Sequence, residues 1–490
     1  MTAATRLSNA ALSRLPSAVA RPRYDRAALR TGIVHLGLGA FHRAHQAVYT
    51  EAAIAAGDPR WGILGASLRA ADTRDALAPQ DGLYTVCVRD AGGERCAVIG
   101  ALRGVVVAPE DPQALVAAMA APDVRIVSLT VTEKGYCHDP ARGELRADHP
   151  DIVHDLAHPD RPRSAPGFIV AALARRRAAG LPPFTVLTCD NLPANGETAR
   201  RVVAAFARLR DADLGRYVEG EVAFPSTMVD RIVPATTDED RAKIAAALGV
   251  ADAWPVMTEP FTQWVVEDRF PHGRPDWRGV EFTQNVAPYE AMKLRLLNGA
   301  HSSIAYLGCL AGWQTVSSAM ADPDLARFVR ALMDEEVTPT LTAPPGFDVE
   351  GYKRALIDRF RNPALKHRTA QIAMDGTQKL PQRLLGPIRD RLAQGAPIAC
   401  LALGVAAWMR YAAGVGENGE RFEVKDPLAA ELARRGAAAA GGPAALTASF
   451  LEMTSVFGEE LPRDGRFRAA VDAALAALTQ RGARATLAAM

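Results

Sequence analysis

The feature that most restricts the fold of this chain is an alternation of short apolar runs with helix-like segments through its first half. Apolar runs of four to eight residues have the length of strands, and the segments between them have the composition of helices. Strands that alternate with helices predict a parallel sheet with crossover helices. We expect strands at 33–36, 61–68, 124–131 and 184–189, and helices at 44–56, 112–120 and 167–179.

The pattern changes near Pro288. From there to Met490 the chain consists mostly of Ala/Leu/Arg-rich segments with helical periodicity, interrupted by proline and glycine. The length of 490 residues also favours two domains. We therefore expect an α/β protein, with a Rossmann-type parallel-sheet domain over 1–285 and an all-α domain over 286–490.

Composition excludes several classes of protein. Hydrophobic residues make up 49% and charged residues 23%, which is typical of globular chains and not of disordered, collagen-like or coiled-coil ones. The net charge of +2 argues against binding nucleic acid by bulk charge, and no stretch approaches the roughly 18 apolar residues of a membrane span. We expect neither a nucleic acid nor a membrane as partner.

The cysteines and the N-terminus predict a cytoplasmic protein. The six cysteines are scattered without a C-x-x-C pair, so we interpret them as reduced thiols and expect neither a metal site nor a disulfide framework. Residues 1–23 lack acids and a continuous apolar core, which favours a short disordered lead-in, with a transit peptide as the alternative.

A glycine turn follows the first expected strand. Gly37 and Gly39 stand where a Rossmann fold needs a tight turn and a close approach of the backbone to a pyrophosphate, and His42 replaces the usual third glycine. The turn alone is equally typical of a plain strand-to-helix connection, but its position favours a dinucleotide site. The candidate residues at this turn are Gly37, Gly39, Ala40 and Phe41.

The end of the second expected strand bears on the choice of dinucleotide. Asp72 has the better position for a ribose-binding acid, whereas Asp58 precedes the strand. Asp72 is equally suited to cap a helix. We therefore expect NAD as the cofactor. Because Arg69 lies close by and suits a 2′-phosphate, we leave NADP open.

The segment that starts the helical half combines a lysine, an amide and a histidine. Lys293, Asn298 and His301 lie at offsets of zero, five and eight, which on an α-helix correspond to about 0°, 140° and 80°. A lysine beside a nicotinamide can act as proton donor and acceptor in ketone/alcohol redox chemistry, and amides can hold an oxyanion. A surface lysine, a capping asparagine and a core histidine are the alternative.

Two further polar candidates follow expected strands. Asn191 stands directly after a strand, at the carboxyl edge where open parallel sheets bind ligands, although Asp-Asn before proline is also ordinary turn chemistry. Asp230 and Arg231 lie between apolar residues. They suit either a substrate contact or a buried structural ion pair.

Six segments in order resemble the polyol-specific long-chain dehydrogenase/reductases, the mannitol dehydrogenase family. They are 37–45, 132–137, 189–193, 228–232, 259–261 and 293–301. The resemblance implies an N-terminal Rossmann-type domain, a helical C-terminal domain, and metal-independent, NAD(P)-dependent interconversion of a sugar ketone and a secondary alcohol. It assigns Lys293 as general acid/base, Asn191 and Asn298 as oxyanion-stabilising amides, and His301, Asp230 and Lys379 as substrate-binding residues.

The branch of this family bears on the substrate. Mannitol dehydrogenases typically have glycine where this chain has Lys134, and arginine where it has Gln371, whereas residues 367–383 are similar to the fructuronate-reducing branch. That resemblance implies a substrate with a carboxylate, D-fructuronate, reduced to D-mannonate. Cations would bind such a group. The candidates are Lys134, Arg368 and Arg383, and ion pairs with Asp139 or Asp375 are the alternative.

Other functions stay open at this stage. A mannitol or D-arabinitol 2-dehydrogenase is the nearest alternative, and a catalytically silent NAD-binding sensor comes from another class. A metal-dependent polyol dehydrogenase is a further alternative, but we interpret no H-x-x-x-H motif or Cys/His cluster as support for it. We expect a monomer or weak homo-oligomer acting on a small sugar acid or polyol.

Overall fold

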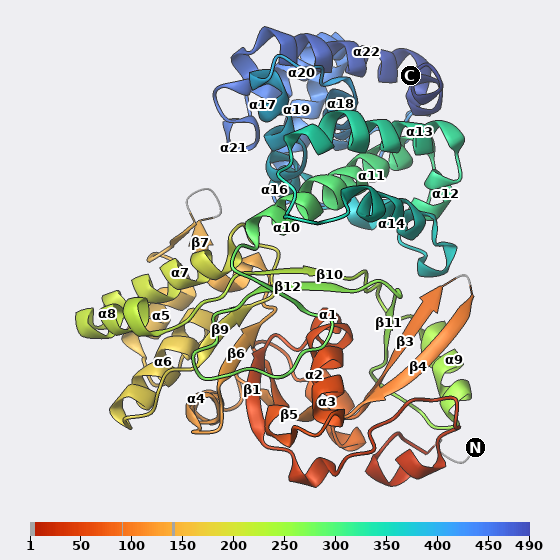
Figure 1. Cartoon of the computed structure of the whole chain (residues 1–490). Coiled ribbons are helices and arrows are strands. Elements are labelled where there is room, and N and C mark those ends of the chain that lie inside the picture. Colours follow the sequence, from red (N-terminus) through yellow and green to blue (C-terminus); the bar gives the residue numbers. More distant parts are fainter. Residues whose placement is uncertain (1–4, 91, 140–142) are drawn as a thin grey trace. The chain divides into compact units, whose positions relative to one another are not determined.

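The first unit of the chain, Met1–Ala287, is built around a five-stranded sheet in which all neighbours pair in parallel (Figure 1). The structure is a computed structural model that describes residues 5–90, 92–139 and 143–490. The strand order is β5-β2-β1-β6-β9. The predicted parallel sheet is therefore confirmed. Its strands are β1 Thr31–Leu36, β2 Gly62–Ser67, β5 Leu102–Val107, β6 Ile126–Leu129 and β9 Thr185–Thr188.

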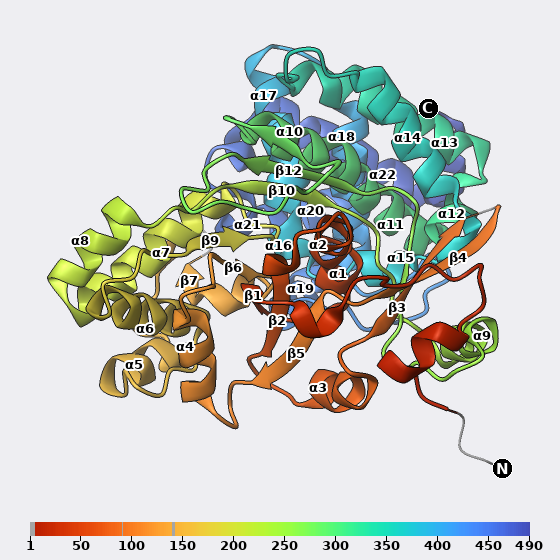
Figure 2. The same ribbon diagram turned by 60° about the horizontal axis from the view of Figure 1, so that its bottom comes forward.

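Helices cover both faces of this sheet because successive side chains of a strand point to opposite faces. Val34 and Leu36 of β1 pack in one core with α4, α6 and α7, while Ile33 packs in another with α1 and α2. Figures 1 and 2 show α4 to α8 gathered on one side of the sheet. The helices of this unit are α1 Ala40–Ala44, α2 Gln46–Ala55, α3 Asp72–Leu77, α4 Pro112–Ala120, α5 Pro150–Ala157, α6 Ala165–Ala178, α7 Asn195–Arg210, α8 Ala212–Glu221 and α9 Asp238–Leu248.

Two of these helices begin where local capping chemistry predicts. Asp111 accepts a hydrogen bond from the N–H of Ala114 at the start of α4, and Ser164 accepts one from Gly167 at the start of α6. Both helices carry proline in their first turn, where its missing N–H costs nothing. The expected helix at 112–120 is confirmed with these bounds, and that at 167–179 begins two residues earlier.

Three smaller sheets were not expected from the sequence. Two have the orders β11-β3-β4 and β10-β12-β13, and β7 pairs with β8. The expectation of a disordered N-terminus is wrong for residues 5–23, since Leu7, Ala11, Leu15 and Val19 are buried beside β3, β4 and α9. The strands are β3 Tyr84–Asp90, β4 Gly93–Ile99, β7 His138–Asp139, β8 Glu144–Leu145, β10 Thr227–Asp230, β11 Val256–Thr258, β12 Gln263–Glu267 and β13 Glu281–Thr283.

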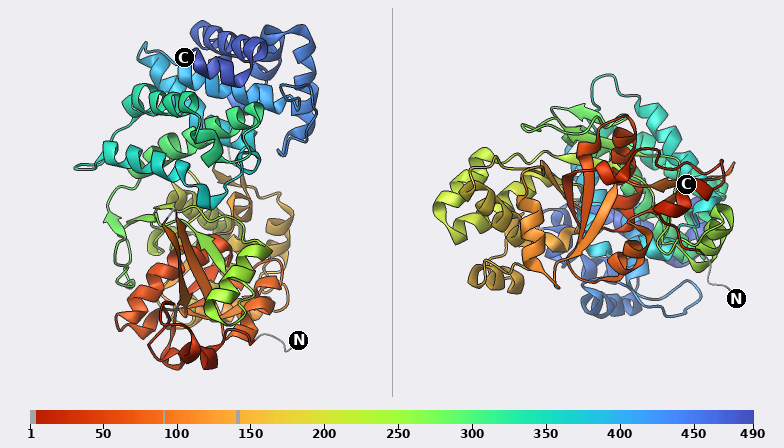
Figure 3. Two further views of the ribbon diagram at one scale, coloured as in Figure 1. Left: turned by 90° about the vertical axis from the view of Figure 1, so that its right-hand side faces the viewer. Right: turned by 90° about the horizontal axis from the view of Figure 1, so that it is seen from below.

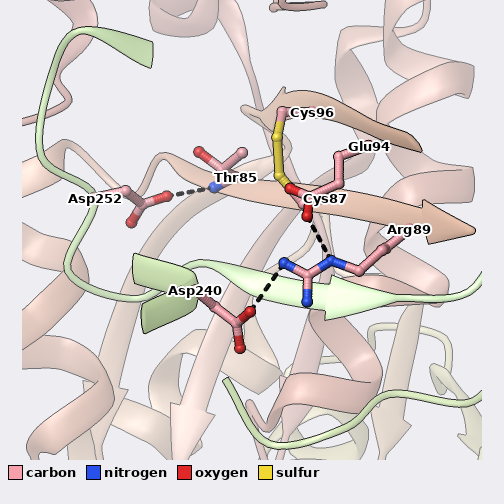
Figure 4. The surroundings of a disulfide bond; sticks show 7 residues. All are labelled: Thr85, Cys87, Arg89, Glu94, Cys96, Asp240 and Asp252. Carbon is pink, nitrogen blue, oxygen red and sulfur yellow. Dashed lines mark hydrogen bonds and ion pairs between the residues drawn. A yellow bond between two sulfur atoms is a disulfide. The ribbon is translucent and has the colours of Figure 1, made fainter. Parts of the chain in front are cut away.

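The interpretation of all six cysteines as free thiols is also wrong. Cys87 and Cys96 form a disulfide, with their Cα atoms 4.2 Å apart (Figure 4). They face one another because β3 and β4 pair antiparallel, with Cys87 directly opposite Cys96. Spacing alone does not show this pairing, since it depends on the register of a hairpin. Cys137, Cys189, Cys309 and Cys400 are free.

The second unit, Pro288–Met490, consists of helices and connecting segments, as predicted (Figure 3). Across the described part of the chain, no helix is both long and apolar enough to cross a membrane. The bounds are α10 Ala287–Met292, α11 Ala300–Ala311, α12 Val316–Met320, α13 Pro323–Ala331, α14 Val349–Arg361, α15 Thr369–Ile372, α16 Gly376–Leu380, α17 Gly386–Ala393, α18 Ala399–Ala412, α19 Ala429–Gly436, α20 Pro443–Leu451, α21 Thr454–Phe457 and α22 Gly465–Ala488, with π-helical segments at Lys293–Gly299, Leu332–Val337 and Pro381–Leu385.

The disulfide should stabilise the first unit by restricting the unfolded chain. A closed loop of about ten residues corresponds to roughly 2–3 kcal/mol on the chain-entropy relation. We expect Cys96→Ser to lower the free energy of unfolding by about that amount, measured by urea denaturation. In a reducing agent, the free energy of unfolding of the wild-type protein should fall to that of the variant. The reducing agent should leave the free energy of unfolding of the variant unchanged. Equal stability of the oxidised wild type and Cys96→Ser would contradict this.

Candidate active site

A pocket of about 1040 Å³ opens in the first unit at the carboxyl ends of its parallel strands. The residues after β1, β2 and β6 line it, together with the loop that leads into α6. This is the edge at which open α/β sheets bind ligands. The volume is at the upper end of the range for small-molecule and cofactor sites.

The glycine turn forms one wall of this pocket. Gly37 has φ +89°, and a Cβ at this position would lie 2.2 Å from the carbonyl oxygen of Thr130, so only glycine fits. At Gly39 an added Cβ would meet a single atom within 4 Å, the Gly37 oxygen at 3.9 Å. Gly39 therefore leaves its backbone open to the pocket, which suits close approach of a pyrophosphate. The residues present fit a dinucleotide.

Two buried histidines support the turn from behind. His35 Nε2 lies 2.8 Å from Thr130 Oγ1 and 3.2 Å from the Gly37 carbonyl oxygen, and Nδ1 lies 2.8 Å from Ser128 Oγ. The ring of His42 stacks on that of His35, with centroids 3.4 Å apart. Burial lowers the pKa of His35 to about 3 and that of His42 well below its usual value, so both rings are neutral. His42 thus occupies the position of the third glycine as part of the core.

The other predicted cofactor residues divide into two groups. Arg69 lines the pocket, as do Gly37 and Gly39. Ala40, Phe41 and Asp72 are not part of its lining; Asp72 is exposed at the start of α3, and Phe41 stacks on His45. The prediction that Asp72 binds the ribose therefore finds no support in the shape of the pocket.

A buried carboxylate organises the residues that follow β6. Asp190 accepts hydrogen bonds from the N–H groups of Val131 (3.0 Å) and Thr132 (2.9 Å) and from the hydroxyl of Tyr136 (2.8 Å). Burial raises the pKa of Asp190, and these hydrogen bonds oppose the rise. Sequence reasoning singled out the neighbouring Asn191 and missed this role, which the parallel pairing of β6 with β9 makes possible.

Asn191 and Asp230 follow or end two strands of the first unit. Asn191 is exposed directly after the turn that ends β9, and Asp230 is the last residue of β10, with 4% of its surface exposed. Asn195, which the sequence did not indicate, joins these strands: its amide accepts from the N–H of Thr227 in β10 and donates to the carbonyl oxygens of Thr227 and of Thr188 in β9. Arg231 donates to the carbonyl oxygens of Glu259 and Ala44.

In the second unit, Lys293 and Asn298 lie in a π-helix, Lys293–Gly299, instead of an α-helix. The expected separation of 140° is therefore wrong. A π-helix bonds residue i to i+5, so residues five apart lie one above the other on the same face. Lys293 is buried, at 8% exposed, and Asn298 is half-buried. Short π-helical insertions are frequent at functional sites.

His301 lies one turn further on, in α11, among cationic side chains. Its ring packs against Phe360 and His367, with centroid distances of 4.7 and 5.1 Å. Burial, His367 and the positive charges of Arg359, Arg383 and Lys379 hold its pKa well below the usual value. Its buried Nε2 has no hydrogen-bond partner among the described residues. A buried ring nitrogen of this kind is typical of a ligand or water position.

The predicted cations of the second unit have different surroundings. Lys379 Nζ donates to the carbonyl oxygen of Ile372 (3.1 Å). Arg383 Nη1 donates to Ser302 Oγ (3.1 Å) and lies 3.5 Å from the Asn298 carbonyl oxygen. Arg368 is exposed, and its side chain forms no hydrogen bond or ion pair within residues 5–90, 92–139 and 143–490.

One group of possible metal ligands lies in the first unit. The ligand atoms of Cys137, His149 and Asp151 lie within 4.8 Å of one another. Burial and the carboxylates of Asp151 and Asp155 raise the pKa of Cys137 to about 12, which keeps the thiol protonated at neutral pH. Metal ligation would require the thiolate.

Comparisons with known proteins agree with this architecture. A family model for the mannitol dehydrogenase Rossmann domain matches residues 31–279, and one for the mannitol dehydrogenase C-terminal domain matches 285–479. D-mannonate oxidoreductase of Escherichia coli (strain K12) is 47% identical over 484 residues, which cover 98% of this chain and 99% of that protein. Mannitol 2-dehydrogenase of Phaeosphaeria nodorum is 43% identical over 496 residues, covering 99% of this chain and 86% of that protein.

A solved structure gives the same fold. Pseudomonas fluorescens mannitol 2-dehydrogenase, in a ternary complex with NAD and D-mannitol, superposes with a TM-score of 0.91 at 42% identity, over 99% of both chains. The protein is thus an oxidoreductase with a Rossmann domain and a helical domain. It belongs to the mannitol dehydrogenase family, as the sequence motifs indicated.

The neutral state of His35 predicts an acid sensitivity. Its folded-state pKa lies below its unfolded value of about 6.5, so the unfolded state takes up a proton first and stability falls as pH drops below about 6.5. We expect the His35 contribution to cost about 2 kcal/mol between pH 7 and pH 5. Urea denaturation at both pH values checks this. His35→Gln should lose this part of the pH dependence, and an unchanged slope in the variant would contradict the assignment.

Proposed function

We propose that this chain interconverts D-fructuronate and D-mannonate, with NAD(H) as the hydride carrier. The similarity to D-mannonate oxidoreductase supports the substrate, and the glycine turn with its pocket supports a dinucleotide. When bound, the nicotinamide would supply or accept the hydride at the sugar C–O carbon. A small sugar acid would be the partner. We propose a monomer or weak homo-oligomer located in the cytoplasm. The Cys87–Cys96 disulfide means that reduced cysteines no longer support this location.

The observation that carries the substrate proposal is the cationic environment of His301. Arg359, Arg383 and Lys379 act on this ring electrostatically, and its Nε2 has no hydrogen-bond partner in the described chain. D-fructuronate carries a carboxylate that fructose and mannitol lack. Guanidinium and ammonium groups form strong, charge-assisted hydrogen bonds to carboxylates.

Lys293 is proposed as the general acid/base. It would give a proton to the ketone oxygen in reduction and take one from the alcohol in oxidation. Asn298, five positions on in the π-helix, and Asn191 would donate N–H groups to the developing oxyanion. His301, Asp230, Lys379 and Arg383 would bind the sugar, as would Lys134 and Arg368.

Mannitol 2-dehydrogenase activity is the second candidate, because relatives with that name reach 42–43% identity. The deciding experiment follows NADH consumption with D-fructuronate and D-fructose in parallel. A higher kcat/KM for D-fructuronate supports the proposal. A higher value for D-fructose would replace it with the mannitol 2-dehydrogenase assignment.

Removal of the proposed acid/base should act on turnover alone. We expect Lys293→Ala to lower kcat by about 10²–10⁴-fold, which is typical of lost general acid–base catalysis, with NADH affinity retained. The exposed Lys425 serves as the control, since Lys425→Ala should leave kcat unchanged. A fall of less than about threefold in Lys293→Ala would remove the mechanistic role and favour a silent NAD-binding protein.

Arg368 offers a test of carboxylate binding with little risk to the fold, because it is exposed. We expect Arg368→Ala to raise KM for D-fructuronate about tenfold and to leave D-fructose turnover unchanged, since a charge-assisted hydrogen bond is worth about 1.5–3 kcal/mol. Arg330→Ala, an exposed arginine on α13, is the matched control. An equal change for both substrates would show that Arg368 does not contact the carboxylate.

A further inference from the structure

A cysteine, a histidine and an aspartate of the first unit bring three possible metal-ligand atoms together. The Sγ of Cys137, a ring nitrogen of His149 and a carboxylate oxygen of Asp151 all lie within 4.8 Å of one another. The ligands of a tetrahedral zinc ion stand roughly 3.3–3.8 Å apart, so the three atoms need to close by at most about 1.5 Å. His149 and Asp151 have room to rotate by this much, since 27% and 47% of their side-chain surfaces are exposed.

The hairpin of β7 and β8 brings Cys137 next to the start of α5. The chain leaves Cys137 along β7 and returns along β8, where the N–H of Arg146 donates to the Cys137 carbonyl oxygen (2.9 Å). The N–H of His149 then donates to the Arg146 carbonyl oxygen (3.0 Å), and α5 begins directly after His149. Asp151 stands in the first turn of that helix. Backbone pairing therefore places the three side chains beside one another.

His149 has the protonation pattern that ligation requires. Its Nδ1 accepts a hydrogen bond of 3.2 Å from the N–H of Asp151, so in the neutral ring this nitrogen is bare and Nε2 carries the proton. The same Nδ1 lies 3.9 Å from Oδ2 of Asp151. A cation between these two atoms would replace a long hydrogen bond. The N–H that it releases is one of the first amides of α5, which have no helical partner and are commonly satisfied by water.

Cys137 supplies a thiol that forms no hydrogen bond with any described residue. The carboxylates of Asp151 and Asp155 act on this thiol electrostatically, and Arg146 and Arg69 act in the opposite sense. A divalent ion displaces the thiol proton when it binds, and its positive charge offsets the repulsion between the new thiolate and the two carboxylates. The negative charges that keep the free thiol protonated thus favour a cation.

The chemistry of the three ligands selects a class of ion. Thiolate and imidazole ligands suit Zn²⁺ and the similar Co²⁺, whereas Mg²⁺ and Ca²⁺ prefer sets of oxygen ligands. Three protein ligands leave the fourth position of a tetrahedral ion to water.

We propose that Cys137, His149 and Asp151 bind a single Zn²⁺ ion, with water as the fourth ligand. The inference goes beyond the proposed function and does not depend on it, since the proposed acid/base, Lys293, belongs to the second unit and its chemistry needs no metal. It departs from the expectation, based on the spacing of the cysteines, that the chain has no metal site. Because Cys137 and Asp151 line the pocket of the first unit, the bound ion forms part of the pocket wall.

Cobalt binding tests the site through its sulfur ligand. The full chain, with its disulfide oxidised and with bound metals removed by a chelator, is titrated with Co²⁺ alone. We expect one equivalent to produce a sulfur-to-cobalt charge-transfer band in the near ultraviolet, and one equivalent of Zn²⁺ to abolish it. The band should be absent in Cys137→Ser. It should persist in the control Cys309→Ser, which replaces a free, half-buried cysteine of the second unit.

The other two ligands are tested by affinity, in variants that keep the thiol. Loss of an outer-shell partner alone lowers metal affinity about 10–100-fold, so removal of a ligand should cost at least as much. We expect isothermal titration calorimetry with Zn²⁺ to show such a loss in His149→Gln and in Asp151→Asn. Asp151→Asn is nearly isosteric at a half-buried position, so it should leave the fold intact. His272→Gln, at a half-buried histidine of the same unit, is the control and should keep the wild-type affinity.

Three outcomes would overturn the proposal. The absence of a charge-transfer band in the wild type with Co²⁺ would exclude the thiolate ligand, as would a band that persists in Cys137→Ser. The pocket is also lined by an H-x-x-x-H pair that sequence reasoning missed, His154 and His158, whose ring centroids lie 4.9 Å apart. If the affinity for Zn²⁺ falls in His158→Gln and not in His149→Gln, the ion binds to that pair instead.

Discussion

The geometry of the first unit's pocket depends on the buried carboxylate of Asp190. It receives two successive backbone N–H groups, those of Val131 and Thr132, and the hydroxyl of Tyr136. Thr132 has φ +63°, a conformation that costs a non-glycine residue free energy, and the carboxylate offsets that cost. Asp190 follows β9, whereas Val131 and Thr132 follow β6, so this carboxylate connects the ends of two neighbouring strands. It thereby holds in place the segment that carries Lys134.

The glycine turn needs a comparable support on its other side. His35 reaches both Thr130 and the Gly37 carbonyl oxygen, and His42 stacks on its ring. A buried pair of neutral histidines resists collapse of the turn but loses stability in acid, because the unfolded rings take up protons first. The glycine turn is thus backed by buried polar side chains, of which His35 is hydrogen-bonded through both ring nitrogens.

How far the sequence predicted this protein differs from element to element. The helix at 112–120 was predicted with correct bounds from its composition, and the structure shows that its start is also fixed locally, by the cap of Asp111 and by Pro112. The family was predicted from motifs in a fixed order. The Cys87–Cys96 disulfide was missed because it depends on hairpin register. The angular relation of Lys293 to Asn298 was wrong because a π-helix has no distinct signature in composition or periodicity.

The sequence by itself determined the fold class, the family and the identity of the candidate residues, since these follow from periodicity, capping residues and ordered motifs. Only the tertiary structure decided which of the candidate residues line the pocket of the first unit. It placed Arg69 in the pocket lining and Asp72 outside it, although the two are only three positions apart in the sequence. It also brought the positive charges of Arg359, Lys379 and Arg383 to act on His301. The physical reason is that side-chain direction and long-range contacts are set by packing, which short-range sequence patterns do not encode.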